Sequence, residues 1–270
     1  MKTNTNLLGK RSNLSLIALI AVAVACTHMA RGGPDNGDKI IIGETAEIAG
    51  GTAATWARVN GGGKVIWVGL TIPVSMAENM PPRGTGAAGA IAVLNFPAIV
   101  QETTYFNHAE IHSNPAGHGH GGLDPHRYEA PHFDFHFYNI PVADVWAIPG
   151  GMFLVDTPAE RVPEGYGQPE PRSVPQMGRH CSSLAERAAT EEDHWLYTTI
   201  LGFLPDASYM HFLEPMITRE ALLLRQNITL PVPMPAVLGR ATNYPTECEV
   251  HYDRDADAYH IVFKGFEPIE

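Results

Sequence analysis

The stretch HFDFHFY, residues 132–138, alternates polar and aromatic side chains at every position. In an extended strand successive side chains point to opposite faces, so His132, Asp134, His136 and Tyr138 share one face and three phenylalanines share the other. A helix would scatter the same rings around its whole surface, and aromatic residues favour strands. The stretch therefore predicts a β-strand with one apolar face for the core and one polar face for chemistry.

The rest of the chain predicts the same kind of structure. Strand-like patterns occur at residues 39–48, 52–59, 64–72, 90–100, 105–112, 195–203, 209–214, 247–252 and 258–263. Short helices are expected at residues 184–193 and 218–225. The 22 prolines and 26 glycines favour turns over long helices. We expect a mainly β fold, an α+β arrangement with few short helices, whose antiparallel sheets form a sandwich or a barrel-like unit.

Composition indicates a globular domain behind an N-terminal export segment. Hydrophobic residues make up 44% of the chain and charged residues 17%, which is typical of a folded protein. Residues 39–270 are expected to form one β-rich domain, or two packed halves joined by segment 156–177. That segment is rich in proline, so we expect it to be irregular.

The first 38 residues predict an export signal and a tether. Three basic residues precede an apolar run, Leu14–Ala25, which is too short for the roughly 20 residues that span a bilayer. Such a run fits a signal peptide over residues 1–25, and the small residues before Cys26 resemble a bacterial lipobox. Lipidated Cys26 and a tether over residues 26–38 would hold the protein at a membrane. We expect an envelope lipoprotein, periplasmic or outer-membrane-anchored, with a secreted protein as the alternative.

The charge of the chain excludes nucleic acid as a partner. The formal net charge is −11, and removal of residues 1–25 takes away three positive charges and makes it −14. Nucleic-acid phosphates demand a basic surface, which a chain this acidic does not offer.

Two cysteines, Cys181 and Cys248, remain after Cys26. In an oxidising compartment such a pair is a candidate disulfide. Two free buried thiols are the alternative, and Cys181, which follows His180, is also a candidate ligand or nucleophile.

The polar face of residues 132–138 predicts a metal site. Residues two apart on a strand lie about 6.6 Å apart and residues four apart about 13 Å, so His132–Asp134 and Asp134–His136 are the natural chelating pairs. Asp134 could instead orient a histidine ligand. Further ligands must come from elsewhere, and the candidates are His118 in a glycine-rich loop, His180 and Glu214. A site of histidines and a carboxylate with an open position suits zinc, iron or manganese.

Several motifs resemble a bacterial family of domains of unknown function that has a representative from Thermus. They are PHFDFHFY at Pro131–Tyr138, NPAGHGH at Asn114–His120, MGRH at Met177–His180, FLEPMIT at Phe212–Thr218 and the tail Tyr244–Phe266. The similarity extends over most of the chain from about residue 40, and the octapeptide is the most specific of these motifs.

The resemblance directs attention to the polar positions inside the matching motifs. These are His118, His132, Asp134, His136, His180 and Glu214. The family has no established activity, and neither Cys181 nor Cys248 belongs to its pattern.

Three functions follow from these observations. The first is an exported metal-binding protein whose ion activates water or oxygen, with Asp134 or Glu214 as proton acceptor. The second is a non-enzymatic envelope module in which the polar strand lines a small-molecule pocket or a homo-oligomer interface. The third is a metal-buffering protein that uses the histidines of loop 117–122.

Overall fold

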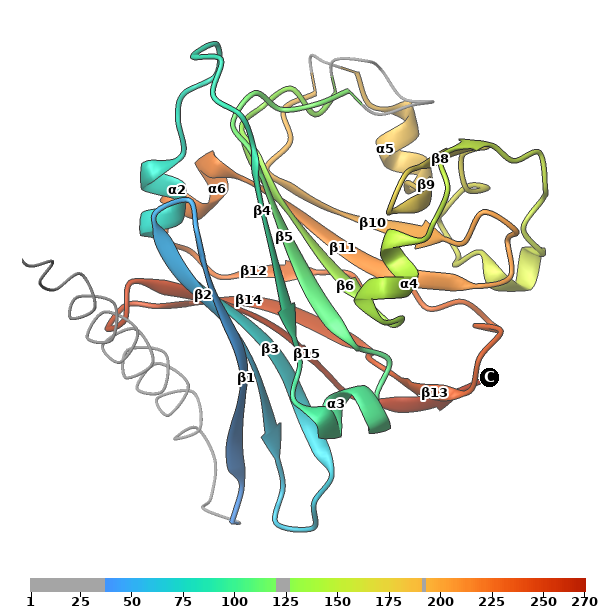
Figure 1. Cartoon of the computed structure of the whole chain (residues 1–270), viewed down its shortest axis with the longest axis horizontal. Helices are drawn as coiled ribbons and strands as arrows, with labels where there is room; N and C mark the ends of the chain where they lie inside the picture. The colour runs from blue at the N-terminus through green and yellow to red at the C-terminus, as the bar shows by residue number, and fades with distance from the viewer. Residues whose placement is uncertain (1–36, 120–126, 191–192) are drawn as a thin grey trace, which may run out of the picture.

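The computed structural model describes residues 37–119, 127–190 and 193–270, and two antiparallel sheets dominate it (Figure 1). The six-stranded sheet has the order β1 (Lys39–Ile48), β2 (Gly51–Val59), β3 (Val65–Pro73), β15 (Ala258–Lys264), β14 (Glu247–Asp253) and β12 (Ile228–Leu230). The eight-stranded sheet has the order β4 (Ala90–Asn95), β5 (His108–Asn114), β6 (His132–Tyr138), β11 (Met210–Thr218), β10 (Tyr197–Phe203), β9 (Gly178–Cys181), β8 (Arg172–Val174) and β7 (Gly151–Met152). A separate pair consists of β13 (Thr242–Tyr244) and β16 (Glu267–Ile269).

The helices are short and lie at the ends and outer faces of the sheets (Figure 1). They are α2 (Ser75–Asn79), α3 (Ala98–Thr103), α4 (Val142–Trp146), α5 (Leu184–Ala188), α6 (Arg219–Leu223) and the 3-10 turn η1 (Ala159–Arg161). Among the residues that the structure describes, no helix has the length and apolar character needed to cross a membrane.

The two sheets pack face to face and enclose one main core. Phe133, Phe135 and Phe137 of β6 are fully buried there, together with residues from the six-stranded sheet such as Leu70 and Ile261. Both sheets are open, with β1 and β12 at the edges of one and β4 and β7 at the edges of the other. The expected mainly β fold is confirmed, and it is a sandwich and not a closed barrel.

Proline accounts for two corrections to the expected elements. The strand expected at residues 90–100 ends at Asn95, because Pro97 precedes the first turn of α3 and favours a helix start. The segment 156–177 was expected to be irregular, but it contains η1 and β8. Strand β8 lies between Pro171 and Pro175, so its own three residues keep their backbone donors.

A third correction concerns β11, which was expected to end at Glu214 and instead continues to Thr218. Its ladder with β6 pairs residues up to Leu213 and resumes at Met216, and Pro215 lies in the gap. A proline within a sheet removes one donor, and here the ladder is interrupted beside Glu214. The helix expected at residues 184–193 is also shorter and ends at Ala188.

The two cysteines are not bonded to each other. Both are free and buried in the main core, Cys181 on β9 of one sheet and Cys248 on β14 of the other. Burial raises the pKa of the Cys181 thiol to about 12, so it is a poor ligand or nucleophile. The signal peptide and Cys26 lie outside the described residues.

Candidate metal centre

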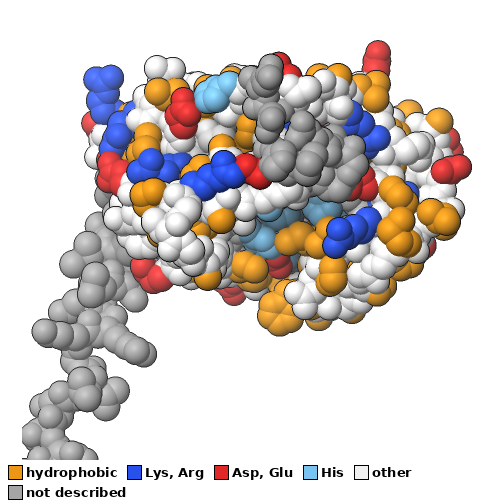
Figure 2. All heavy atoms as spheres, turned by 90° about the horizontal axis from the view of Figure 1, so that it is seen from above, with side chains coloured by type: hydrophobic (Ala, Val, Ile, Leu, Met, Phe, Trp, Pro, Cys, Tyr) orange, Lys and Arg blue, Asp and Glu red, His pale blue; other side chains and the backbone are white. Residues whose placement is uncertain are grey.

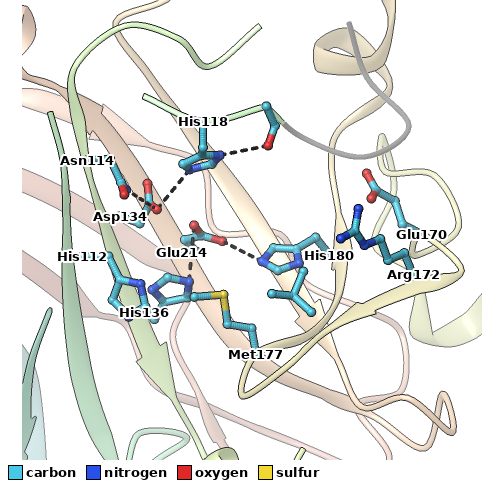
Figure 3. Close-up of a pocket in the computed structure, with 12 residues that line it drawn as sticks. His112, Asn114, His118, Asp134, His136, Glu170, Arg172, Met177, His180 and Glu214 are labelled. Atoms are coloured by element: carbon cyan, nitrogen blue, oxygen red, sulfur yellow. Dashed lines mark hydrogen bonds and ion pairs between the residues drawn. The ribbon is translucent and has the colours of Figure 1, made fainter. Parts of the chain in front are cut away.

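The polar side of β6 faces away from the core and lies between two strands that carry matching polar residues. Across β5, Asp134 is paired with His112 and His136 is paired with Glu110. On the other side, Glu214 of β11 projects from the same outer face (Figure 3). The antiparallel register thus brings residues that are more than 70 positions apart in sequence onto one surface.

The first cluster, here called the Asp134 group, consists of His118, His132 and Asp134. Nε2 of His132 lies 3.1 Å from Oδ1 of Asp134, and Nε2 of His118 lies 3.3 Å from Oδ2. Asn114 donates a hydrogen bond of 2.7 Å to the same Oδ2 and so fixes the carboxylate. One ligand atom from each of the three residues lies within 4.8 Å of the others, as metal ligation requires.

The backbone contacts of the two histidines point their Nε2 atoms at Asp134, where a metal ion could bind. Nδ1 of His132 is 2.6 Å from the carbonyl oxygen of Ala130, and Nδ1 of His118 is 3.2 Å from that of Gly119. A carbonyl oxygen only accepts, so each neutral ring carries its proton on Nδ1 and a lone pair on Nε2. Burial opposes protonation of His118, but the hydrogen bond to Asp134 and the charge of Asp134 outweigh it and raise the pKa of His118. A metal ion would take the place of a proton on Nε2, between the ring and the carboxylate.

The second cluster, here called the Glu214 group, consists of His136, His180 and Glu214, all buried. Nε2 of His136 lies 3.4 Å from Oε1 of Glu214, and Nε2 of His180 lies 3.9 Å from Oε2. The three residues come from β6, β9 and β11. Strand β10 separates β9 from β11, and its Gly202, the residue paired with His180, has the Phe212 ring where a side chain would otherwise lie.

The buried ligand atoms of these groups lack hydrogen-bond partners. Within the described residues this holds for Nε2 of His132, Oδ1 of Asp134, both ring nitrogens of His136 and Oε2 of Glu214. Buried polar atoms are nearly always paired in folded proteins, because an unpaired one costs about 1–3 kcal/mol. Their concentration around two points indicates a shared missing partner.

The pKa values of Glu214 and Asp134 are shifted in opposite directions. Burial raises the pKa of Glu214 well above its ordinary value, and the negative charge of Asp134 adds to the effect. Burial also opposes ionisation of Asp134, but the neighbouring His132 and His118 outweigh it and hold its pKa well below the usual range. Burial, reinforced by the charge of His112, lowers the pKa of His136 to about 3. His136 is therefore a neutral imidazole, the form that binds metals.

Both groups open into one cavity of about 280 Å³ on the outer face of the eight-stranded sheet. Its wall includes Asp134 and Glu214 together with Met177, Glu170 and Arg172 from the segment that contains β8 and β9 (Figure 3). Figure 2 shows histidine side chains at the base of a hollow on this side of the molecule. The clusters are therefore within reach of a small molecule.

A further cluster of buried polar side chains, on β5, was not predicted from the sequence. Glu110 lies between two histidines of its own strand, with Oε2 3.1 Å from Nε2 of His112 and Oε1 3.7 Å from Nε2 of His108. Burial opposes its ionisation, but the two histidines lower the pKa of Glu110 to about 2. The signal was present in the sequence, because HAEIH at residues 108–112 repeats the His-apolar-acid-apolar-His pattern of residues 132–136.

The structure brings together all six predicted ligands but divides them between two groups. His132 and Asp134 belong to one and His136 to the other, in agreement with the span that makes His132 and His136 a poor pair. His118 of the glycine-rich loop joins the first group. His120, which the metal-buffering hypothesis also needs, lies outside the described residues.

No protein-family model, curated protein or solved structure matches this chain. The resemblance suggested by the octapeptide at Pro131–Tyr138 therefore stays a prediction, and the functional argument rests on the site.

Proposed function

We propose that this protein binds a divalent transition metal in the cavity on the outer face of its eight-stranded sheet. The observation that carries the proposal is the set of unpartnered, buried imidazole and carboxylate atoms around two points. A buried carboxylate beside neutral imidazoles is costly without a cation and favourable with one. The Glu214 group is the principal centre, because all three of its members are buried.

The ligand types favour zinc, iron or manganese. Imidazole nitrogens suit zinc and iron, and carboxylate oxygens extend the choice to manganese. Two histidines and one carboxylate leave coordination positions open, and the cavity beside them offers space for water or a substrate.

The proposal includes export from a bacterial cell and a lipid anchor at Cys26. Its support is the sequence of residues 1–26, where a basic start and a short apolar run precede a cysteine. Labelling of the expressed full chain with a radioactive fatty acid, compared with Cys26→Ser, tests the anchor. Equal labelling of the two proteins would contradict it.

Elemental analysis of untagged protein tests the metal site. We expect stoichiometric metal after loading with zinc or manganese and removal of unbound ions. His136→Gln and His180→Gln should lose metal from the Glu214 group, whereas the exposed control His194→Gln should keep the wild-type content. Absence of metal from the loaded wild-type protein would overturn the proposal. Loss of subunit assembly in the variants with no change in metal would favour the non-enzymatic module.

A further inference from the structure

The two metal groups are neighbours in one cavity. Asp134 and His136 are consecutive outward-facing residues of β6, a step of about 6.6 Å along the strand. Asp134 of one group and Glu214 of the other line the same cavity. Ions bound in the two groups would therefore lie side by side above the same strand, with the cavity open to both.

The charges of the two groups do not balance two ions. Imidazoles bind metal as neutral ligands, so the carboxylates of Asp134 and Glu214 are the only anionic ligands of the two groups. Two divalent cations bring four positive charges and the carboxylates supply two negative ones, so two positive charges are left. Glu170 and Arg172 are the other charged residues that line the described cavity, and they cancel each other. A net positive charge of this size among mostly buried ligand residues favours an anionic ligand.

Arg172 is placed to select such a ligand. It is the only lysine or arginine among the described residues that line the cavity, and it lies at the wall opposite β6 (Figure 3). Its side chain is exposed, and its guanidinium forms no hydrogen bond or ion pair with the part of the chain that the structure describes. A guanidinium fork matches the paired oxygens of phosphate or carboxylate and binds them with two parallel hydrogen bonds.

We propose that the cavity is a two-metal centre that binds a small oxyanion of the phosphate type between the ions and Arg172. The inference rests on the proposed metal-binding function and adds the second ion and the ligand class. The Asp134 group and the Glu214 group each hold one ion. The oxyanion neutralises the remaining charge by bridging them, with Arg172 on its free oxygens.

The first measurement counts metal ions per chain in the full-length protein by mass spectrometry of the elements, after loading and removal of unbound ions. We expect two ions in the wild type, one in His118→Gln and one in Glu214→Gln. The side chain of His118 is 35% exposed, so its replacement leaves the fold intact where a change at buried Asp134 could unfold it. One ion in both the wild type and His118→Gln would overturn the two-metal centre but not the proposed function. No ion at all would overturn both.

The second measurement is calorimetric titration of the metal-loaded protein with inorganic phosphate. We expect one phosphate per chain, and none in the metal-free protein. Arg172→Gln should weaken phosphate binding about ten- to hundredfold, the effect of losing a charge-assisted pair, with no change in metal content. The matched control is Arg254→Gln, an exposed arginine in the β14–β15 turn. Equal affinity in the wild type and Arg172→Gln, or no binding to protein that holds two ions, would overturn the oxyanion site.

Discussion

The Nε2 atom of His136 lies 3.4 Å from Oε1 of Glu214, and both side chains are buried. The two atoms do not form a hydrogen bond. The imidazole is neutral because burial lowers its pKa to about 3, and burial raises the pKa of the carboxyl group. Without a metal the pair is a cost to the fold, and with a metal it becomes a source of stability.

Glu214→Gln should therefore separate metal-linked stability from intrinsic stability. We expect the metal-free variant to unfold at the same or a higher urea concentration than the metal-free wild type, because an amide is cheaper to bury than a carboxylate. Metal at a hundredfold excess over the dissociation constant of the Glu214 group should stabilise the wild type by about 2.7 kcal/mol more than it stabilises the variant. Glu267→Gln, at an exposed position on β16, is the control. Equal stabilisation of variant and wild type would show that Glu214 is not a ligand.

Gly202 leaves space for the Phe212 ring, which packs against the histidines of the Glu214 group. Phe212 packs against both of its histidines, with ring centroids 5.1 Å from His136 and 5.5 Å from His180. A Cβ atom at Gly202 would lie only 1.9 Å from the Phe212 ring, so the ring must move.

We expect Gly202→Ala to destabilise the protein by about 1–3 kcal/mol, as overpacking does, and to weaken metal binding through the displaced ring. Chemical denaturation and metal titration measure the two effects. Gly62→Ala lies in the β2–β3 turn, where the nearest atom to an added Cβ is 3.4 Å away, and it should change neither quantity. An unchanged metal affinity in Gly202→Ala would show that Phe212 does not position the histidines.

The alternation of polar and apolar residues predicted the β fold and half of the candidate ligands, namely His132, Asp134 and His136. The alternation at residues 132–138 defines which side chains enter the core, because a strand has only two faces. The same rule would have placed Glu110 beside His112, since HAEIH alternates in the same way. The division of the ligands into two groups could not be predicted from the sequence. It depends on the register between β6 and β11, which places Glu214 next to His136 and not next to Asp134. Register follows from the packing of the whole sandwich, which one chain segment does not encode.

The apolar face of β6 gives a test of the core that is independent of the site. Phe135 is fully buried and stacks on Phe133 at a centroid distance of 5.8 Å. Phe135→Ala should lower the free energy of unfolding by about 3–5 kcal/mol, because it removes buried apolar area and leaves a cavity. Urea denaturation measures the loss, and Leu154→Ala, at a side chain that is 86% exposed, should change it by less than about 0.5 kcal/mol. A small effect at Phe135 would contradict the inward orientation of the rings.

A buried histidine in the other sheet predicts the response to acid. His260 lies on β15, where its Nδ1 is 2.7 Å from Oγ1 of Thr71 and its Nε2 is 3.7 Å from Oδ2 of Asp253. Trp56 also donates a hydrogen bond of 2.9 Å to Oγ1 of Thr71, so the ring lies in a buried polar cluster. Burial lowers the pKa of His260 to about 4, although Asp253 opposes the shift.

The unfolded chain binds this proton below about pH 6.5 and the folded chain only below about pH 4, so acid favours unfolding between these values. The contribution of His260 to stability is complete above about pH 6.5 and is lost as the pH falls to 4, a change of about 3 kcal/mol. His260→Asn keeps a partner for Thr71 but has no titrating group, so its stability should fall less steeply over this interval. Urea denaturation at several pH values measures both slopes. Parallel curves for the two proteins would mean that the ring is not held neutral.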